Sequence, residues 1–216
     1  MIKKLLQIAL FKSLFFNLKH FGAKGLKMPV LFAKRCRVRV KGEIELEKFS
    51  GGAVKIGFGG SEGVVEHRYS YFSVAPGAKI IFRGKAGISA GNSIRVDAGV
   101  LSLGRNFSTN KNCFIACSKG VSIGDDVTLG WDVHIRDNDG HTIIDGETGA
   151  RSESREVSIG NHVWLCAYTD VLKGSVVPDE SVVAYRSLVT KAFDKPHSLI
   201  GGAPAKLLKE NIRWEY

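Results

Sequence analysis

The sequence is poor in cysteine and proline, and no apolar run in it is long enough to cross a bilayer. Its four cysteines form no CxxC pair and lack the spacing of a metal site, so we expect reduced thiols in a cytoplasmic protein; they are Cys36, Cys113, Cys117 and Cys166. The apolar start is interrupted by Lys12 and no small-residue cleavage site follows, which argues against a signal peptide.

Acidic residues are missing from one end of the chain. Residues 1–41 contain none, and residues 1–48 hold twelve Lys and Arg against three Glu. Residues 49–216 are nearly balanced, with nineteen basic and eighteen acidic side chains. This distribution argues against a whole-surface nucleic-acid binder, and we expect no nucleic-acid partner. A basic segment on a neutral body instead suits a membrane surface or another polyanion.

The apolar residues of segment 2–21 follow helical spacing, with lysines on the rest of the turn; they are Leu5, Ile8, Leu10, Phe11, Leu14, Phe15, Leu18 and Phe21. Two interpretations remain open. The helix lies on the inner leaflet of the cytoplasmic membrane, with Phe and Leu inserted and Lys facing anionic lipid. Alternatively, it packs its apolar face on the body of the protein.

Glycine is abundant, with 25 residues that indicate many tight turns, and apolar residues recur every six positions. The repeat runs through Ile123, Leu129 and Ile135, and then through Ile159, Leu165, Val171, Val177, Val183 and Val189. A period of six fits neither a helix nor a long alternating strand. It predicts an all-β fold, a parallel β-helix in which three hexads form one triangular coil and the coils stack. Such hexads resemble those of the left-handed parallel β-helix, an exception to right-handed crossovers.

The repeat divides the chain into three parts. We expect a basic helical or extended segment over residues 1–48, the β-helix domain over residues 49–192, and a short C-terminal tail or helix over residues 193–216. Residues 22–80 are expected to begin or cap the column and to contribute to acceptor recognition.

The repeat stops at Arg136 and resumes at Ile159, so residues of about 136–158 are predicted to form one extruded loop. The loop is polar and contains Asp137, Asp139 and His141. A smooth column offers no cleft of its own, and loops on rigid scaffolds commonly carry the chemistry. We therefore expect the functional site beside this loop.

Three stretches together carry a family resemblance: "DNDGHTIID", then "VSIGNHVWLCAYTDVLKGSVVPDESVVAYRSLVTKAF", then "GGAPAKLLKE". With them the chain resembles bacterial hexapeptide-repeat acyltransferases, in particular the O-acetyltransferases of capsule, exopolysaccharide and lipopolysaccharide synthesis. These are related to galactoside and maltose acetyltransferases. The resemblance implies a homotrimer with active sites between subunits. It also implies transfer of acetyl from acetyl-CoA to a sugar hydroxyl, without a covalent intermediate and without a metal.

The resemblance also assigns roles to residues. His141 is the implied general base, because an ordinary histidine, with a pKa of about 6.5, accepts a proton at neutral pH. A carboxylate is expected to hold its tautomer, and we favour Asp139 over Asp137. The implied contacts to acetyl-CoA are Trp164, Cys166, Ala167, Ala184, Tyr185, Thr190, Lys191 and Lys206.

Two of these positions depart from the family pattern. Cys166 stands where glycine is common, and Ala184-Tyr185 replaces a Gly-Ala-like pair.

Three alternative functions stay open: an N-acyltransferase for an amino sugar, a zinc carbonic anhydrase using His134, His141 and His162, and a non-catalytic scaffold. A nucleophilic role for Cys166 is disfavoured, because no neighbour in the sequence lowers its pKa.

Overall fold

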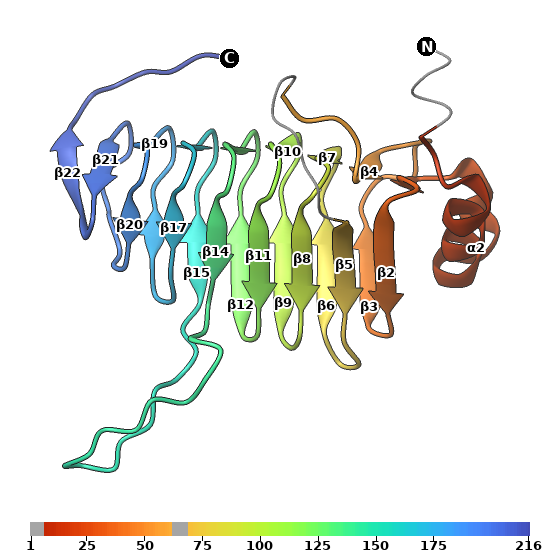
Figure 1. The fold of residues 1–216 in the computed structure, drawn as a ribbon. Coiled ribbons are helices and arrows are strands. Elements are labelled where there is room, and N and C mark those ends of the chain that lie inside the picture. Colours follow the sequence, from red (N-terminus) through yellow and green to blue (C-terminus); the bar gives the residue numbers. More distant parts are fainter. Residues whose placement is uncertain (1–6, 62–68) are drawn as a thin grey trace.

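The hexads fold into short strands that stack into a three-sided column (Figure 1). The computed structural model describes residues 7–61 and 69–216. Residues 1–6 of the expected basic helix, and residues 62–68 of the segment expected to contribute to acceptor recognition, lie outside the described residues. All strand pairs of the three sheets are parallel except the last. The left-handed parallel β-helix predicted from the sequence is confirmed.

Each face of the column is one sheet. The nine-stranded sheet contains β1 (Val30–Phe32), β4 (Val54–Ile56), β7 (Ala86–Ile88), β10 (Phe107–Thr109), β13 (Thr128–Leu129), β16 (Trp164–Leu165), β19 (Val182–Val183), β21 (Leu199–Gly202) and β22 (Ala205–Lys209). The seven-stranded sheet contains β2 (Cys36–Val40), β5 (Ser70–Val74), β8 (Ser93–Val96), β11 (Phe114–Cys117), β14 (His134–Arg136), β17 (Asp170–Val171) and β20 (Leu188–Val189). The six-stranded sheet contains β3 (Glu43–Leu46), β6 (Lys79–Phe82), β9 (Val100–Leu103), β12 (Gly120–Ile123), β15 (Val157–Ile159) and β18 (Val176–Val177).

The coils become shorter toward the C-terminus. Tyr71 pairs with Ser93, 22 positions on, and Phe114 pairs with His134, 20 positions on. Asp170 pairs with Leu188, 18 positions on. Only a coil of 18 residues consists of three whole hexads, which explains why the strict repeat is confined to the C-terminal half of the sequence.

The core changes with coil length. The N-terminal coils bury phenylalanines, and the C-terminal coils bury valines; the buried residues include Phe32, Phe72, Phe82 and Phe107 at one end and Val171, Val177, Val183 and Val189 at the other. Small hydroxyl residues occupy buried corner positions of the short coils. For example, Ser187 Oγ donates to the carbonyl of Ala184 at 2.6 Å and Ser175 Oγ to that of Val189 at 3.0 Å. The narrower coils are therefore filled by smaller side chains with internally satisfied hydroxyls.

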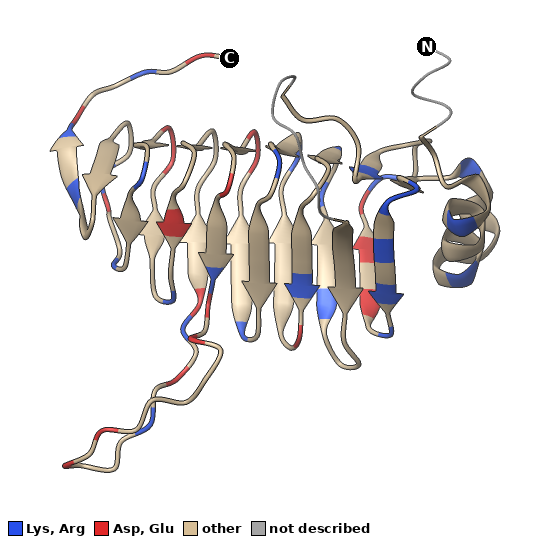
Figure 2. Ribbon diagram, viewed as in Figure 1, with Lys and Arg blue, Asp and Glu red and all other residues tan. Residues whose placement is uncertain are grey.

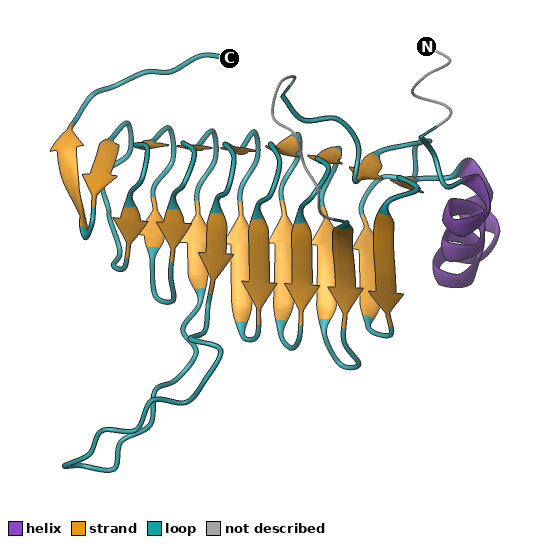
Figure 3. Ribbon diagram, in the orientation of Figure 1, coloured by secondary structure: helices purple, strands orange, loops and turns teal. Residues whose placement is uncertain are grey.

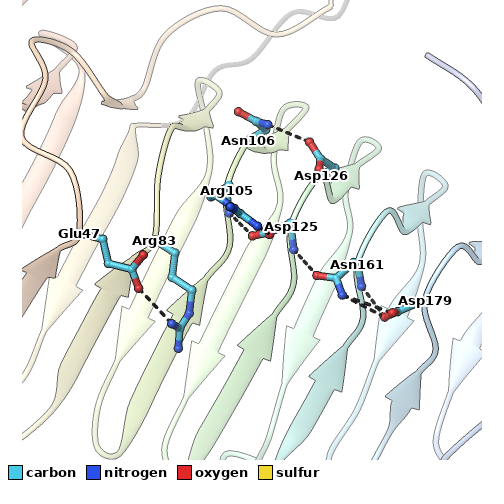
Figure 4. Close-up of polar contacts among 8 residues, drawn as sticks. All are labelled: Glu47, Arg83, Arg105, Asn106, Asp125, Asp126, Asn161 and Asp179. Atoms are coloured by element: carbon cyan, nitrogen blue, oxygen red, sulfur yellow. Dashed lines mark hydrogen bonds and ion pairs between the residues drawn. The ribbon is translucent and has the colours of Figure 1, made fainter.

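Polar side chains link successive coils along the corner between the six-stranded and nine-stranded sheets (Figure 4). Asn106 donates to Asp126 at 2.8 Å, and the backbone N–H of Asp125 donates to Asn161 at 2.9 Å. Equivalent turn residues of this corner adopt the left-handed conformation, with φ of 50–58°; they are Asn106, Asp126, His162 and Glu180. Asn and Asp tolerate this region better than most residues, which fits their use here.

Each end of the column is covered by a different element. Helix α2 (Leu10–Phe21) and the 3-10 helix η1 (Gly22–Lys27) lie at the N-terminal end, and the antiparallel pair β21–β22 closes the other (Figures 1 and 3). The last segment thus forms a hairpin and an extended tail rather than a helix. No helix among the described residues is long and apolar enough to cross a bilayer.

The column also begins earlier than the expected boundary at residue 49. Strands β1, β2 and β3 already pair with the next coil, as in the contact between Val30 and Val54. Their partners lie 24 to 36 positions downstream, as for Val30 with Val54 and for Glu43 with Lys79. A period of six cannot be recognised across such irregular spacing.

Candidate active site

The extruded loop (residues 137–156) leaves the corner between the seven-stranded and six-stranded sheets (Figure 3). It joins β14 to β15 without disturbing the stack, because Ile135 still pairs with Val171 and Val121 with Val157. Figure 1 shows it projecting far from the column. The residues of the loop are therefore the first candidates for the functional site.

The loop starts at a buried carboxylate. Asp137 is fully buried, and its oxygens accept the backbone N–H groups of Ser118, Lys119 and Gly120 at 2.9, 2.6 and 2.8 Å. Asn138 donates a further hydrogen bond at 3.0 Å. Charge-assisted bonds of this kind are stronger than neutral ones. Asp137 therefore fastens the loop to the turn of the preceding coil, and its carboxylate is occupied by these hydrogen bonds.

Asp139 fastens the loop to the following coil. Its carboxylate forms an ion pair with the ammonium of Lys173. The hydrogen bond from Lys173 lowers the pKa of the Asp139 carboxyl from its ordinary value, against an opposing contribution from burial. In this chain taken alone, Asp139 is thus engaged by a lysine, and the structure does not bring it into hydrogen-bond contact with His141.

Beyond these anchors the loop is a hairpin with its own hydrogen bonds. The backbone N–H of Ser152 donates to Ile143 at 2.8 Å, and that of Asp145 donates to Ala150 at 2.8 Å. The Asp145 carboxylate caps the tip by accepting the N–H groups of Glu147 and Thr148, which lowers the pKa of Asp145. A segment fixed at its base and closed at its tip can carry a side chain to a defined place.

His141 lies on this hairpin and is exposed. Its imidazole makes no hydrogen bond within the part of the chain that the structure describes. Beside it Ile143 and Ile144 are exposed by 64% and 55%. Two exposed isoleucines on a projecting arm are unusual for a surface that stays in water.

The residues expected to contact the acyl donor lie mainly on another part of the column. Trp164 projects from β16 of the nine-stranded sheet and is 39% exposed, and Cys166 and Ala167 follow in the turn after it. A Cβ at Gly130 would lie 2.5 Å from the backbone nitrogen of Ala167, so only glycine fits there. Burial raises the pKa of the Cys166 thiol to about 11, so the thiol is protonated at neutral pH.

The same corner of the column carries a cluster of aromatic and cationic side chains. The rings of Tyr168 and Tyr185 meet edge to face with centroids 5.4 Å apart, and the guanidinium of Arg186 lies 5.7 and 5.5 Å from the two rings. Ala184, next to Tyr185 in the sequence, is partly buried. Within the described residues the buried indole N–H of Trp131, in the equivalent turn of an earlier coil, has no hydrogen-bond partner. Of these five residues, the sequence had indicated Ala184 and Tyr185 but not Tyr168, Arg186 or Trp131.

The three remaining residues that were predicted to contact acetyl-CoA lie in two different places. Thr190 and Lys191 follow β20 at the same corner that carries the loop, two coils nearer the C-terminus; both are exposed, and Lys191 lies over the ring of Phe193. Lys206 is exposed on β22, opposite Gly201. One chain thus presents His141, Asp139, Thr190 and Lys191 on one corner and Trp164, Cys166, Ala167, Ala184 and Tyr185 on or beside another sheet.

The other histidines of the suspected zinc set are each paired with a carboxylate of the next coil. His134 Nδ1 lies 3.1 Å from Asp170, and His162 Nδ1 lies 2.7 Å from Glu180. They project from different sheets and turns, and no group of three or more metal-ligating side chains occurs among the described residues. The zinc alternative gains no support from this arrangement.

The C-terminal tail contributes residues that the sequence did not reveal. Trp214 stacks on His162 with ring centroids 4.2 Å apart, and its indole N–H donates to the His162 carbonyl at 3.0 Å. Its ring lies 6.0 Å from Trp164. The hydroxyl of Tyr216 donates to the carbonyl of Asp126 at 3.2 Å. The tail therefore folds back over the sheet that carries Trp164, a long-range contact that no local pattern signals.

Comparisons with known proteins bear on this arrangement, although no family model matches the chain. The polysialic acid O-acetyltransferase of Neisseria meningitidis is 37% identical over 123 residues, which are 56% of this chain and 57% of that protein. The galactoside O-acetyltransferase of Escherichia coli is 30% identical over 111 residues, 51% of this chain and 54% of that protein. The putative lipopolysaccharide biosynthesis O-acetyl transferase WbbJ of Escherichia coli is 29% identical over 143 residues, 59% of this chain and 72% of that protein.

The chain spans little more than half the length of the first two relatives. All three are named as O-acetyltransferases, WbbJ as a putative one, and two of the names contain polysialic acid or lipopolysaccharide. The resemblance to hexapeptide-repeat O-acetyltransferases that the motifs predict is thereby confirmed.

Proposed function

Starting from this relationship to O-acetyltransferases, we propose that the protein transfers an acetyl group from acetyl-CoA to a sugar hydroxyl of a bacterial surface polysaccharide. His141 acts as the general base. The observation that carries the proposal is an exposed imidazole on a loop that Asp137 and Asp139 fasten to the coils on either side. The names of the relatives support the reaction class and the class of acceptor.

The proposed reaction needs no covalent enzyme intermediate. A neutral ring nitrogen of His141 takes the proton of the sugar hydroxyl as the oxygen attacks the thioester carbonyl. The tetrahedral intermediate then collapses and breaks the C–S bond. The leaving CoA thiolate takes the proton from the imidazolium, so that acetylated sugar and free CoA are formed and His141 returns to its neutral form. Positioned backbone N–H groups would stabilise the oxyanion.

The division of the site between two corners leads to the second element of the proposal. His141 of one copy completes a site on the Trp164 face of another, and a homotrimer closes this arrangement around one axis. Exposed Ile143 and Ile144 would become buried in the groove between the copies. The protonated Cys166 lines the path of the thioester and does not attack it.

Residues of both corners would hold the donor. Trp164 and Tyr185 offer flat apolar surfaces, with Cys166, Ala167 and Ala184 forming the narrow part between them. Lys191 and Lys206 provide cations for the phosphates of CoA, and Thr190 a hydroxyl donor. Asp139 holds the loop through Lys173 and, in the assembled site, positions His141. We place the reaction in the cytoplasm, where acetyl-CoA is available.

The experiment is a thiol-release assay with purified protein, acetyl-CoA and a panel of capsule, exopolysaccharide and lipopolysaccharide fragments. We expect CoA release that depends on the acceptor, together with a base-labile O-acetyl ester in the product by NMR. Both should be absent for His141→Ala. An acetyl amide in the product, or acceptor-dependent release that persists in His141→Ala, would contradict the proposal.

A further inference from the structure

The side of helix α2 that faces the column carries two buried polar residues, Ser13 and Asn17, beside Phe16. Asn17 is fully buried and pairs with Val30, donating to its carbonyl at 2.6 Å and accepting its N–H at 3.1 Å. Ser13 is also fully buried and accepts the N–H of Phe32 at 3.0 Å. The helix therefore satisfies the open edge of β1 and protects it from pairing with another chain. Of the apolar side chains of the helix, Phe16 and Phe21 pack on the column, whereas Phe11 and Phe15 do not.

The outward side of the helix is apolar. Phe11 and Phe15 are 86% and 72% exposed, and Leu10 and Leu18 complete the stripe on the helix; Leu26 of η1 is also exposed. Positions 11, 15 and 18 are spaced by four and three residues, so they share one face. Phe16, the aromatic residue on the opposite side, is buried against Phe32 with ring centroids 4.8 Å apart. The exposed apolar residues of the stripe therefore lie on a different side of the helix from the residue that packs in the core.

The part of the sequence that carries this stripe is basic, and residues 1–41 contain no Asp or Glu. The described part of residues 1–41 contains Lys12, Lys19, Lys24, Lys27, Lys34, Arg35, Arg37, Arg39 and Lys41, and the first acidic residue is Glu43. Figure 2 shows Lys and Arg on the helix and on β2, whereas acidic residues appear from β3 onward. Lys12 and Lys19 are seven positions apart on one side of the apolar stripe. The ammonium of Lys12 donates to the carbonyl of Cys36 at 2.8 Å, and Lys19 is exposed.

From this combination we infer that the apolar stripe (Leu10, Phe11, Phe15, Leu18 and Leu26) docks the N-terminal end of the column on an anionic lipid bilayer. Phe and Leu enter the headgroup boundary while the lysines face lipid phosphates. Charge complementarity selects this occupant over a second copy, because two copies joined here would bring two wholly basic segments together. The docking is independent of the acetyl transfer proposed above, since the stripe lies at the end of the column away from β16 and β19.

The test is sedimentation of the full chain with two sets of vesicles. One is pure phosphatidylcholine and the other contains about one third phosphatidylglycerol. We expect binding to the anionic set only, weakening as salt rises from about 0.1 to about 1 M and the Debye length falls from about 10 to about 3 Å. Phe11→Ser combined with Phe15→Ser should lower the partition coefficient at least about tenfold. Lys24→Gln combined with Lys27→Gln should lower it about fivefold for each lysine.

The matched control is Leu207→Ser combined with Leu208→Ser, which removes two exposed leucines at the opposite end of the column and should leave vesicle binding unchanged. Thermal melts identify any variant that fails to fold, and acetyl transfer to a soluble acceptor should be equal in wild type and Phe11→Ser/Phe15→Ser. Three results would overturn the inference: equal binding to neutral vesicles, retained binding by Phe11→Ser/Phe15→Ser, or self-association through the stripe without vesicle binding.

Discussion

The column and the extruded loop are built by opposite means. The column buries an apolar residue at nearly every inward position and is held together coil by coil, whereas residues 140–151 of the loop are all exposed. The loop is instead held by polar contacts at its base, through Asp137 and Asp139. The difference teaches that stability and chemistry are assigned to separate parts of the chain. Substitutions should therefore separate melting temperature from activity.

Substitution of His141 should show the largest loss of activity without a change in melting temperature. His141→Ala should lower kcat by about 10²- to 10⁴-fold, the range for loss of a general base, with an unchanged melting temperature because the side chain is exposed. His134→Gln is the matched control, since His134 is a partly exposed histidine of the column paired with Asp170. Equal losses of activity in the two variants would break the distinction between loop and column.

Two isoleucines only eight positions apart should differ in the opposite way, in their effect on stability. Ile135 is fully buried in β14, so Ile135→Ala should lower the free energy of unfolding by about 2–5 kcal/mol. Ile143 is exposed in the loop, and Ile143→Ala should change it by less than about 0.5 kcal/mol for the isolated chain. Denaturant unfolding measures the change in the free energy of unfolding for both variants.

The same Ile143→Ala substitution should weaken assembly of the copies. Unaltered sedimentation at micromolar concentration would count against burial of the loop between copies.

Asp137 lies where the two regions join, so its substitution should affect both. Asp137→Asn keeps the shape but replaces an acceptor oxygen by an NH₂ group that cannot receive the N–H groups of Ser118, Lys119 or Gly120. We expect a loss of about 1–3 kcal/mol in stability and faster hydrogen exchange at these amides. Asn138→Ala, which removes only a neutral donor, should have a smaller effect. Unchanged exchange in Asp137→Asn would show that the carboxylate does not fasten the loop.

The pH dependence should distinguish the anchor from the chemistry. The pKa of Asp139 is lowered in the folded chain, so its contribution to stability is complete above the unfolded value of about 3.9 and is lost only as pH falls through the folded value. Loop amides should keep their protection between pH 7 and pH 5. A loss of activity over that range would then not arise from release of the loop, and loss of amide protection there would contradict the role of Asp139 as an anchor.

The smallest effect is expected at Cys166. Because burial raises the pKa of its thiol to about 11, alkylation by iodoacetamide should be slow at pH 7 and accelerate steadily toward pH 10. Cys166→Ser should retain acetyl transfer within about threefold, since no thiolate takes part in the proposed steps. Complete loss of activity in Cys166→Ser, with the column intact by circular dichroism, would instead favour a covalent mechanism.

The regular half of the column could be predicted from the sequence, because each hexad reports its own inward residue. The first coils could not, since their partners lie at irregular distances and no repeat links Val30 to Val54. For the site, the sequence located the loop and its histidine. The sequence did not indicate that Lys173 would pair with Asp139, because these residues meet only through the stacking of coils. It also did not indicate that Trp214 would lie near Trp164, because this contact depends on the tail folding back over the sheet.

The central claim is that the loop of one copy and the wall of another form one site, and subunit mixing tests it most directly. His141→Ala and Trp164→Ala are each prepared as inactive homo-oligomers, then unfolded together and reassembled at equal amounts. In randomly mixed oligomers about a quarter of the sites pair an intact loop with an intact wall, so about a quarter of wild-type activity should return. No recovery in demonstrably mixed oligomers would contradict a site shared between copies.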